Sequence, residues 1–317
     1  MIIVTGGAGF IGSNLVRALN ISGRKDLLVV DDLSDGHKFQ NIAGCSISDY
    51  FDKDEFAQII ESGKRKFDKI DAVFHLGACS DTTEWDGRMM LDNNYRYSKE
   101  VLHFCMQNKI PLIYASSAAV YGTGDKFSED ADCENPINVY AYSKLLFDNY
   151  VRRVMEKAES QIVGLRYFNV YGRGEAHKGE MASVAYQFNK QILEDSKVKL
   201  FEGISGYSDG EQLRDFIYVD DVVAISRWFM SAPQVSGIFN VGTGDPHTFN
   251  DMAKTVIDWH GHGEIEYISF PEKLRNNYQS FTKADLTRLR SIGCDYKCNS
   301  LESGMKEYLG WLNKTAA

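Results

Sequence analysis

The sequence predicts an α/β fold in which a doubly wound parallel sheet is joined to a smaller mixed α/β domain. From residue 1 to about 115, short apolar runs typical of buried strands alternate with longer runs of helical periodicity. Strands that alternate with helices indicate a parallel sheet with helices on both faces. Beyond about residue 170, glycine-rich segments at 172–179 and 203–210 interrupt the helices and short strands. This change predicts a second, smaller domain in the later part of the chain.

The first expected element is a strand over residues 1–4, and a glycine-rich turn and a helix follow it. Gly7, Gly9 and Gly12 match the pattern G-x-G-x-x-G in the strand–turn–helix context that it requires. In that pattern the first glycine permits the turn, the second lets the backbone approach a pyrophosphate, and the third lets the helix pack closely on the strand. Because the N-terminus of a helix attracts phosphate, the turn predicts a dinucleotide site of the Rossmann type.

The second expected strand, over residues 27–31, supports the same site. It ends in Asp31, about 20 residues beyond the glycine turn, where a carboxylate can accept hydrogen bonds from an adenosine ribose. The alternative is a structural glycine turn with a surface aspartate. The occurrence of both features at this spacing disfavours that alternative.

The next elements extend the first sheet. We expect short strands over 45–47, 71–76 and 111–115, a helix over 53–62 capped by Asp52, and a long helix over 88–108. Ligands of open α/β sheets bind outside the carboxyl ends of the strands. The candidate site residues at those ends are Gly9, Asp31, Asp49, Gly77 and Ser117.

The later elements suggest how the domains divide. A polar stretch over 125–138 precedes a helix over 140–157, a buried strand over 162–167 and a further strand and turn over 238–244. We assign residues 1–170 to a Rossmann domain, to which residues 214–244 return. Residues 171–213 and 245–317 are expected to form a substrate-binding domain.

The overall composition restricts the classes of function. The 317 residues can form one large or two medium domains, and the hydrophobic fraction of 44% is ordinary for a globular protein. A net charge of −9 argues against a broad nucleic-acid-binding face. No apolar run approaches the roughly 20 residues of a membrane span, and a strand at residue 1 leaves no basic region for a signal peptide. We therefore expect neither nucleic acid nor membrane as a partner.

Six scattered cysteines predict free thiols in a reducing cytoplasm. Cys294 and Cys298 are the one close pair, and the nearest histidines, His260 and His262, do not complete a zinc-binding spacing. The expected protein is cytoplasmic and has no metal site.

Tyr140 and Lys144 form a candidate acid–base pair. They lie four residues apart, so they share one face of the expected helix. An ammonium beside a phenol favours the phenolate, which lowers the pKa of the tyrosine and makes it a usable acid or base near neutral pH. Ser117, at a strand end, could hydrogen-bond the same substrate oxygen. The spacing alone is a weak signal, because Tyr95 and Lys99 share it.

Several stretches together resemble the extended short-chain dehydrogenase/reductases that modify nucleotide sugars. They occur in the family's order over most of the chain, at 5–12 (TGGAGFIG), 75–78 (HLGA), 116–122 (SSAAVYG), 140–144 (YAYSK), 166–172 (RYFNVYG) and 214–221 (RDFIYVDD). In this family the active tyrosine follows the Ser-Ser strand end, so the resemblance selects Tyr140 over Tyr95. It places Tyr95 in the long helix, whose Asn93 lies near the site in the family.

Other stretches resemble the family members that act on ADP-linked heptoses. They lie mainly outside the shared motifs, at 82–87, 177–179, 181–185, 200–203 and 275–279. Three places depart from the expected pattern. Glu180 stands where a small polar residue is usual, Gln187 stands where a histidine is common, and 205–212 forms a longer loop. These departures concern substrate contacts rather than the chemistry.

The resemblance implies inversion at C6 of the heptose, by transient oxidation to a ketone and re-reduction on a tightly bound NADP. The acid–base groups would be Tyr140, with Lys144 and Ser117 beside it, and Lys178. Spacing alone would leave Lys178 a solvated loop lysine, and only the local match gives it this role. The implied substrate-binding residues are Ser117, Asn169, Glu180, Gln187, Phe201, Glu202, Gly203, Ile204, Arg214 and Tyr278.

Arg214 is the implied partner of the diphosphate, because a guanidinium binds such groups in a bidentate manner. A surface ion pair with Asp215 is the alternative for this side chain. The implied cofactor-binding residues belong to the glycine turn, the strand ends and the catalytic positions. They are Gly6, Gly9, Phe10, Ile11, Gly12, Asp31, Asp32, Lys38, Lys53, His75, Leu76, Gly77, Ala78, Asn93, Tyr140, Lys144, Val170 and Lys178.

The choice between NADP and NAD depends on charges near Asp31. Its carboxylate alone favours NAD, because it repels a 2′-phosphate. Lys38 and Lys53 could offset that repulsion by binding the phosphate, and the family is typically NADP-linked. We predict NADP, with NAD as the alternative.

Three other functions remain open at this point. A dehydratase of this family usually carries acids after the Ser/Thr strand end, where this chain has Ala118 and Ala119. A UDP-hexose 4-epimerase shares the general machinery and would not need Lys178. A cofactor-sensing protein on the same fold often lacks the tyrosine–lysine pair, which this chain retains. The resemblance also implies a homo-oligomer, typically a pentamer, and a product used for the core of lipopolysaccharide.

Overall fold

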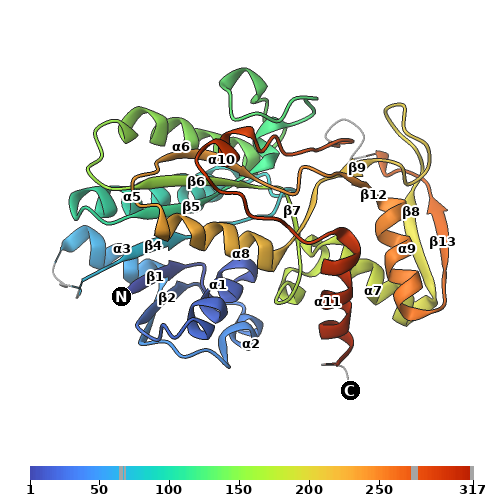
Figure 1. Ribbon diagram of the computed structural model, residues 1–317, viewed down its shortest axis with the longest axis horizontal. Coiled ribbons are helices and arrows are strands. Elements are labelled where there is room, and N and C mark those ends of the chain that lie inside the picture. Colours follow the sequence, from blue (N-terminus) through green and yellow to red (C-terminus); the bar gives the residue numbers. More distant parts are fainter. Residues whose placement is uncertain (64–66, 68, 273–277, 315–317) are drawn as a thin grey trace.

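The computed structural model describes residues 1–63, 67, 69–272 and 278–314 (Figure 1). Its centre is a seven-stranded sheet with parallel neighbours in the order β3–β2–β1–β4–β5–β6–β11. From β1 the chain moves to one edge and then returns to the other side of β1 at β4. This reversal confirms the predicted doubly wound sheet. The strands are β1 (Ile2–Thr5), β2 (Leu27–Asp31), β3 (Asp49–Asp52), β4 (Ala72–His75), β5 (Leu112–Ser117), β6 (Ile162–Tyr167) and β11 (Gly237–Val241).

Helices cover both faces of this sheet. On one face lie α1 (Phe10–Ile21) and α8 (Val219–Trp228), and on the other lie α3 (Lys53–Ser62), α5 (Tyr97–Gln107) and α6 (Val139–Met155). In β1, Ile2 and Val4 pack with α1 and α8, whereas Ile3 packs with the opposite layer. Successive side chains of a strand point to opposite faces. A strand buried on both faces therefore reads as a continuous apolar run, which is why these strands are visible in the sequence.

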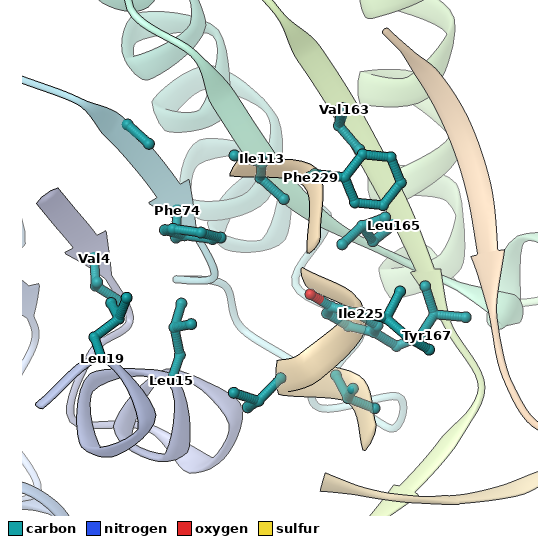
Figure 2. Close-up of a cluster of buried hydrophobic side chains, with 14 of the residues drawn as sticks. Val4, Leu15, Leu19, Phe74, Ile113, Val163, Leu165, Tyr167, Ile225 and Phe229 are labelled. Carbon is teal, nitrogen blue, oxygen red and sulfur yellow. The ribbon is translucent and has the colours of Figure 1, made fainter. Parts of the chain in front are cut away.

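The first of these layers is a dense hydrophobic core. Figure 2 shows Val4 and Phe74 of the sheet facing Leu15 and Leu19 of α1, with Ile225 of α8 in the same cluster. These residues are at most 2% exposed. Burying one such side chain stabilises the fold by about 1.5–3 kcal/mol. The core therefore fixes α1, and with it the glycine turn from which α1 starts.

Local capping explains the helix bounds on the other face. Asp52 begins α3 as predicted, because its carboxylate accepts a hydrogen bond from the backbone N–H of Asp54 at 2.8 Å. The long helix predicted over 88–108 is present but is interrupted. It consists of α4 (Gly87–Leu91), a π-helical turn over Asp92–Arg96, and α5. Such π turns are frequent at functional sites.

A second lobe lies beside the sheet, at the right of Figure 1. Its elements share one hydrophobic cluster, and they are α7 (Val184–Asp195), β8 (Lys197–Phe201), α9 (Phe249–His260), β13 (Glu264–Ile268) and α11 (Leu301–Lys314). β8 and β13 pair in parallel. Phe10, at the start of α1, belongs to the same cluster. The second lobe therefore packs against the N-terminus of α1, where the glycine turn ends.

The chain passes between the two lobes several times. β7 (Asn169–Tyr171) pairs with β10 (Phe216–Tyr218), and β9 (Leu213–Arg214) pairs with β12 (His247–Thr248). After the second lobe, α10 (Thr287–Ser291) returns to the sheet, where Leu289 and Cys294 join its core. The range 245–317, predicted as one part of the second domain, is thus interrupted by this return.

The expectation for the third strand was wrong in position. The strand predicted over 45–47 lies at 49–52. Cys45 and Ile47 are apolar because they pack against the core, although they do not belong to a strand. Asp49 therefore begins β3 instead of following it, and Asp52 stands at the carboxyl end.

None of the described helices is long and apolar enough to cross a membrane. The same part of the chain holds no group of three or more histidine, cysteine or acidic side chains that could bind a metal ion. All six cysteines lie within it and are free thiols.

Candidate active site

Glycines form a cradle where β1 and β4 end. Gly6 has a φ of 67°, and a Cβ on it would lie 2.5 Å from the backbone nitrogen of Gly77. A Cβ on Gly12 would lie 2.1 Å from the carbonyl oxygen of Gly6. Gly9 stands at the N-cap of α1 in an extended conformation. Side chains would fill this space, so the cradle fits the close approach of a dinucleotide pyrophosphate to the backbone.

The role expected of Gly7 was wrong. Gly6, not Gly7, has the positive φ that the turn requires. A Cβ on Gly7 would lie 2.9 Å from a methyl group of Val29 and 2.9 Å from the carbonyl oxygen of Val4. Gly7 therefore serves close packing on β2, and the preceding glycine makes the turn.

Asp31 fastens the glycine turn to the end of β2. One carboxylate oxygen accepts hydrogen bonds from the backbone N–H groups of Ala8 at 2.7 Å and Gly9 at 3.1 Å. The other accepts from the ammonium of Lys38 at 3.0 Å and from the backbone N–H of Asp32 at 2.7 Å. In this structure the carboxylate is thus fully engaged with the protein, at the place where the sequence predicts an adenosine ribose.

A second acid–lysine pair stands next to the first. The ammonium of Lys53 lies 3.2 Å from a carboxylate oxygen of Asp32 and 3.1 Å from the side-chain oxygen of Asn93. Hydrogen bonds from Ser34, followed by the charge of Lys53, lower the pKa of Asp32 to about 2. Two lysines and two aspartates therefore alternate at the end of β2. This arrangement could bind a phosphate through the lysines.

Tyr140, Ser117 and Lys144 come together at the end of β5. Ser117 and Tyr140 both line the cavity, and the Ser117 hydroxyl acts to lower the pKa of the phenol. The ammonium of Lys144 donates to the carbonyl oxygen of Ala115 at 2.9 Å. Tyr140 stands in the first turn of α6. The side chain of Asn138 caps this helix by accepting a hydrogen bond from the backbone N–H of Ala141 at 2.8 Å, so the cap fixes where the tyrosine lies.

The expectation of a lowered pKa for Tyr140 was wrong for this structure. Burial raises the pKa of Tyr140, and the Ser117 hydroxyl opposes this only in part. Burial also lowers the pKa of Lys144 to about 8, against the opposing effect of Asp148. The i, i+4 spacing places both side chains on one face, but desolvation outweighs the attraction expected between them.

Lys178 lies on a 3-10 turn over Ala176–Met181 and reaches the same cavity. Its ammonium stands 5.6 Å from the ring centroid of Phe10, at the start of α1. Burial lowers the pKa of Lys178, and the carboxylate of Glu175 opposes this effect. Lys178 is therefore a partly buried amine on the wall of the cavity rather than a solvated loop residue.

One cavity of about 740 Å³ connects these groups. Of the residues predicted for the site, its lining includes Gly6, Gly9, Phe10, Ile11, Gly12, Asp31, Lys38, Leu76, Gly77, Ala78, Ser117, Tyr140, Lys144, Asn169, Val170 and Lys178. The volume falls within the range typical of small-molecule sites, about 300–1,000 Å³. The cavity thus unites the glycine cradle with both acid–base candidates.

Several lining residues were not among the predicted site residues. Thr82, His177, Ser183, Val184 and Gln279 belong to stretches that the resemblance singles out, whereas Cys79, Ser80 and Asp81 after β4, and Phe249, had been given no role. The 79–82 loop is held by Asn94 of the π turn, whose amide bonds both the N–H and the carbonyl of Cys79 at 2.8 Å. Residues 79–82 follow the carboxyl end of β4, and this position was the sequence signal that could have predicted them as site residues.

Arg214 and Tyr278 lie together at the side of the second lobe. The guanidinium carbon of Arg214 is 5.0 Å from the ring centroid of Tyr278 and 5.5 Å from that of Phe249, which lines the cavity. Tyr278 in turn contacts Phe270, and Phe270 contacts Phe201. Burial lowers the pKa of Arg214, and Tyr278 opposes this effect. A chain of aromatic rings therefore leads from the cavity to Phe201.

The surface ion pair considered for Arg214 was wrong. Arg214 is 6% exposed, and the carboxylate of Asp215 accepts hydrogen bonds from the N–H groups of Thr243, Gly244 and Ala284. The guanidinium instead donates to the carbonyl oxygen of Leu213 at 3.0 Å. Its remaining donors stand beside the aromatic rings.

Other predicted site residues lie outside the cavity lining. His75 is buried between the hydroxyls of Thr5, at 2.7 Å, and Ser98, at 2.8 Å, and burial lowers its pKa to about 3. Its side chain therefore cannot reach a cofactor in this structure. The lining also omits Asp32, Lys53 and Asn93, described above.

Five predicted substrate-binding residues of the second lobe lie outside the cavity lining. Gln187 donates to the carbonyl oxygen of Gly179, on the turn of Lys178, at 2.7 Å, and Glu180 on that turn is exposed. Glu202 is exposed, and the N–H of Gly203 donates to Asp209 at 2.8 Å. The carbonyl of Ile204 accepts from Tyr207 in the same loop. Residues 275–277 of the stretch 275–279 lie outside the described residues.

The second tyrosine–lysine pair stands away from the cavity. Tyr95 packs edge-on against Tyr150, with a ring separation of 6.3 Å, and the ammonium of Lys99 lies 4.5 Å from its ring centroid. Neither residue lines the cavity. The position of Tyr95 in the interrupted long helix agrees with the expectation.

A family model for the NAD dependent epimerase/dehydratase family matches residues 2–242. The chain belongs to this family. An ADP-L-glycero-D-manno-heptose-6-epimerase of Alkalilimnicola ehrlichii is 57% identical over 309 residues, which are 98% of this chain and 96% of that protein. As a member of an NAD dependent family, the chain has the dinucleotide site that its glycine cradle fits.

Solved structures of the family are similar over the whole chain. A Helicobacter pylori ADP-L-glycero-D-manno-heptose-6-epimerase has a TM-score of 0.86 and 33% identity, covering 98% of this chain and 96% of that one. A UDP-N-acetylglucosamine 4-epimerase of Methanobrevibacter ruminantium has a TM-score of 0.84 and 26% identity, covering 99% and 98%. The fold is thus shared by epimerases with different nucleotide sugars.

Proposed function

We propose that this protein inverts C6 of ADP-D-glycero-D-manno-heptose to give ADP-L-glycero-D-manno-heptose. The observation that carries the proposal is the 57% identity, over 98% of the chain, to a heptose 6-epimerase. The cavity supports it, because Tyr140 and Lys178 line the same space. An inversion by oxidation and re-reduction needs acid–base groups for both orientations of the sugar.

NADP is the cofactor that we propose for the glycine cradle. Gly6, Gly9 and Gly12 would hold its pyrophosphate at the N-terminus of α1, and Lys38 and Lys53 would bind its 2′-phosphate. The chemistry that the dinucleotide supplies when bound is reversible hydride exchange with C6 of the sugar. Family membership supports a nicotinamide dinucleotide, and the two lysines are the reason for choosing NADP.

Two side chains would move the proton of the C6 hydroxyl. The phenol oxygen of Tyr140 serves one orientation of the sugar, and the amine nitrogen of Lys178 serves the other. Burial raises the pKa of Tyr140, which favours the neutral phenol as proton donor. Burial lowers the pKa of Lys178, which brings the neutral amine closer to neutral pH as proton acceptor. Opposite shifts of this kind suit a donor and an acceptor.

Neighbouring residues would hold the nucleotide sugar. Ser117, which lines the cavity with Tyr140, would orient the phenol and hydrogen-bond the reacting oxygen. Arg214 would bind the diphosphate through its guanidinium, with Tyr278 and Phe249 against that group. Asn169 lines the same cavity as Ser117 and would contact the sugar. Glu180, Gln187 and residues 201–204 would complete the pocket by moving toward the sugar.

The cellular setting is part of the same proposal. The product would supply the inner core of lipopolysaccharide in a Gram-negative bacterium, and the enzyme would act in the cytoplasm as a homo-oligomer, with a pentamer as the expected form. The free thiols agree with a reducing compartment.

One experiment tests the activity directly. Purified protein is incubated with ADP-D-glycero-D-manno-heptose without added cofactor, and the C6 configuration is followed by NMR. We expect the L-glycero epimer to form, with no build-up of free NADPH, because the hydride returns to the sugar. Tyr140→Phe should abolish conversion, and Tyr95→Phe, which has the same lysine spacing outside the cavity, should not.

Specific outcomes would contradict the proposal. They are the absence of epimer from protein that carries cofactor, or full activity of Tyr140→Phe. A parallel incubation with UDP-glucose covers the 4-epimerase alternative. Formation of UDP-galactose without conversion of the heptose would favour that alternative.

A further inference from the structure

Glu175 is a buried carboxylate that the proposed chemistry does not use. It is 1% exposed and is not part of the cavity lining. No lysine or arginine of the described residues forms an ion pair with it, and burial raises its pKa. A buried carboxylate is costly unless hydrogen bonds compensate the lost water. The partners of Glu175 therefore indicate what it does.

Four hydrogen bonds converge on this carboxylate. One oxygen accepts from the N–H of Gly172 at 3.1 Å, the hydroxyl of Ser183 at 2.8 Å and the hydroxyl of Tyr308 at 2.8 Å. The other accepts from the N–H of Ser183 at 2.5 Å. Gly172 and Ser183 bracket the segment that contains Lys178. Glu175 thus ties both ends of this segment to one point and fastens that point to α11.

The opposite side of the segment is held by two asparagines. Asn14 of α1 donates to the carbonyl oxygen of Arg173 at 2.6 Å. Asn41 donates to the carbonyl oxygens of Gly174 at 3.1 Å and Ala8 at 2.9 Å. These contacts join the start of the segment to the glycine turn. Its far end, at Ser183, is held by Glu175.

The charges around Lys178 are few. Glu175, three residues earlier, is the carboxylate that opposes the lowering of its pKa by burial. His177 stands beside it, and Lys38, Asp35 and Asp31 face that imidazole from the cofactor side. The ring of Phe10 covers the ammonium at 5.6 Å. Glu175 therefore combines a geometric and an electrostatic influence on Lys178.

We propose that Glu175 is a positioning residue for Lys178, because its carboxylate closes the segment 172–183 and holds the amine on the cavity wall. The proposal rests on the proposed function, in which Lys178 is the second acid–base group. It assigns a role to α11 as well, since Tyr308 connects this helix to the carboxylate. The second lobe then contributes to the reaction through the placement of one side chain.

The first test compares Glu175→Gln with wild type in the epimerase assay. The glutamine side chain has a similar shape but only one acceptor oxygen. Glu175→Gln therefore loses the negative charge and some of the four hydrogen bonds. We expect kcat to fall roughly 10- to 100-fold, because a misplacement near 1 Å has effects of this size. The KM for the nucleotide sugar should stay within about threefold, since Glu175 does not line the cavity. Glu307→Gln, an exposed acid next to Tyr308, is the matched control and should not change kcat.

A second measurement does not need the substrate. Lysines are methylated with ¹³C, and the Lys178 signal is identified by its absence from Lys178→Arg. In Glu175→Gln this signal should titrate at lower pH than in wild type, and in Glu307→Gln it should not move. If the protein epimerises no heptose, this titration still decides the relation between the two residues.

The proposal is overturned if Glu175→Gln matches Glu307→Gln in both measurements. It is also overturned if the loss of kcat equals the fraction of protein that has unfolded. Where Glu175→Gln does not fold, Tyr308→Phe carries the test, because it keeps the charge and removes one hydrogen bond. Its kcat should fall by less than that of a Lys178→Met variant, at unchanged KM, and an unchanged kcat would overturn the proposal.

Discussion

The ammonium nitrogen of Lys38 lies 3.0 Å from a carboxylate oxygen of Asp31, at the end of the cavity where β2 stops. The other oxygen of the same carboxylate holds the glycine turn through the N–H groups of Ala8 and Gly9. The acid that would repel a 2′-phosphate is thus already compensated by protein donors. This relationship is the physical basis for proposing NADP although the strand ends in an aspartate.

The first prediction concerns this pair. Lys38→Ala should weaken NADP binding roughly 10- to 100-fold, because a charge-assisted hydrogen bond contributes about 1.5–3 kcal/mol. NAD binding should change less than about threefold, since NAD has no 2′-phosphate. Calorimetric titration of cofactor-free protein measures both constants, and Lys53→Ala should behave in the same direction. Lys25→Ala, an exposed lysine before β2, is the control. Equal losses for both dinucleotides would count against the phosphate role.

The second prediction uses two glycines with similar backbone angles. Gly6 and Gly63 have φ values of 67° and 60°. A Cβ on Gly63 meets nothing within 4 Å, whereas one on Gly6 would lie 2.5 Å from the Gly77 backbone. Gly63→Ala should therefore lower the free energy of unfolding by about 1 kcal/mol and leave cofactor binding intact. Gly6→Ala should lower it further and abolish retention of the dinucleotide. Denaturant titration and the absorbance of bound cofactor distinguish the two, and equal behaviour would refute the cradle.

The third prediction follows from the pKa of Lys144, which burial lowers to about 8. Above this pH the folded protein has released the proton, whereas the unfolded chain keeps it until its ordinary value of about 10.4. The unfolded state then binds more protons, so the stability contribution of this group rises with pH between these values. Relative to Lys144→Met, wild type should gain roughly 1–3 kcal/mol between pH 7 and pH 10. Denaturation at several pH values measures this, and a constant difference would contradict it.

The fourth prediction concerns the aromatic surroundings of Arg214. Arg214→Lys keeps the charge but loses the planar group between the rings of Tyr278 and Phe249. We expect the KM for the nucleotide sugar to rise about tenfold, equivalent to about 1.4 kcal/mol, with a smaller change in kcat. Arg290→Lys, an exposed position on α10, should have no effect. Initial rates over a range of substrate concentrations separate the two constants.

Local signals made most of the fold predictable. The apolar runs of β1, β2 and β6 reflect burial on both faces, and Asp52 marked the start of α3 correctly. The strand expected at 45–47 failed because Cys45 and Ile47 are apolar for tertiary packing rather than for pairing. A run of this length carries no information that separates the two cases.

The candidate site was predictable in its members more than in its electrostatics. The spacing of Tyr140 and Lys144 correctly placed them on one helix, but it could not show that Lys144 donates to the carbonyl of Ala115. The pKa of Tyr140 depends on the depth of burial, which is a property of the whole fold. Glu175 gave no signal at all, because its burial depends on Tyr308, 133 residues away in the sequence.

The repeated passages of the chain between the lobes have a consequence for how such enzymes diversify. Recombination that transferred residues 172–213 would bring Lys178 but leave Tyr278, α9 and α11 behind. The recipient would lack the Tyr308 hydroxyl that meets Glu175. The second lobe is therefore not encoded by one continuous stretch of sequence that recombination could transfer intact. New sugar specificities on this scaffold are expected to arise by point substitutions in the lining.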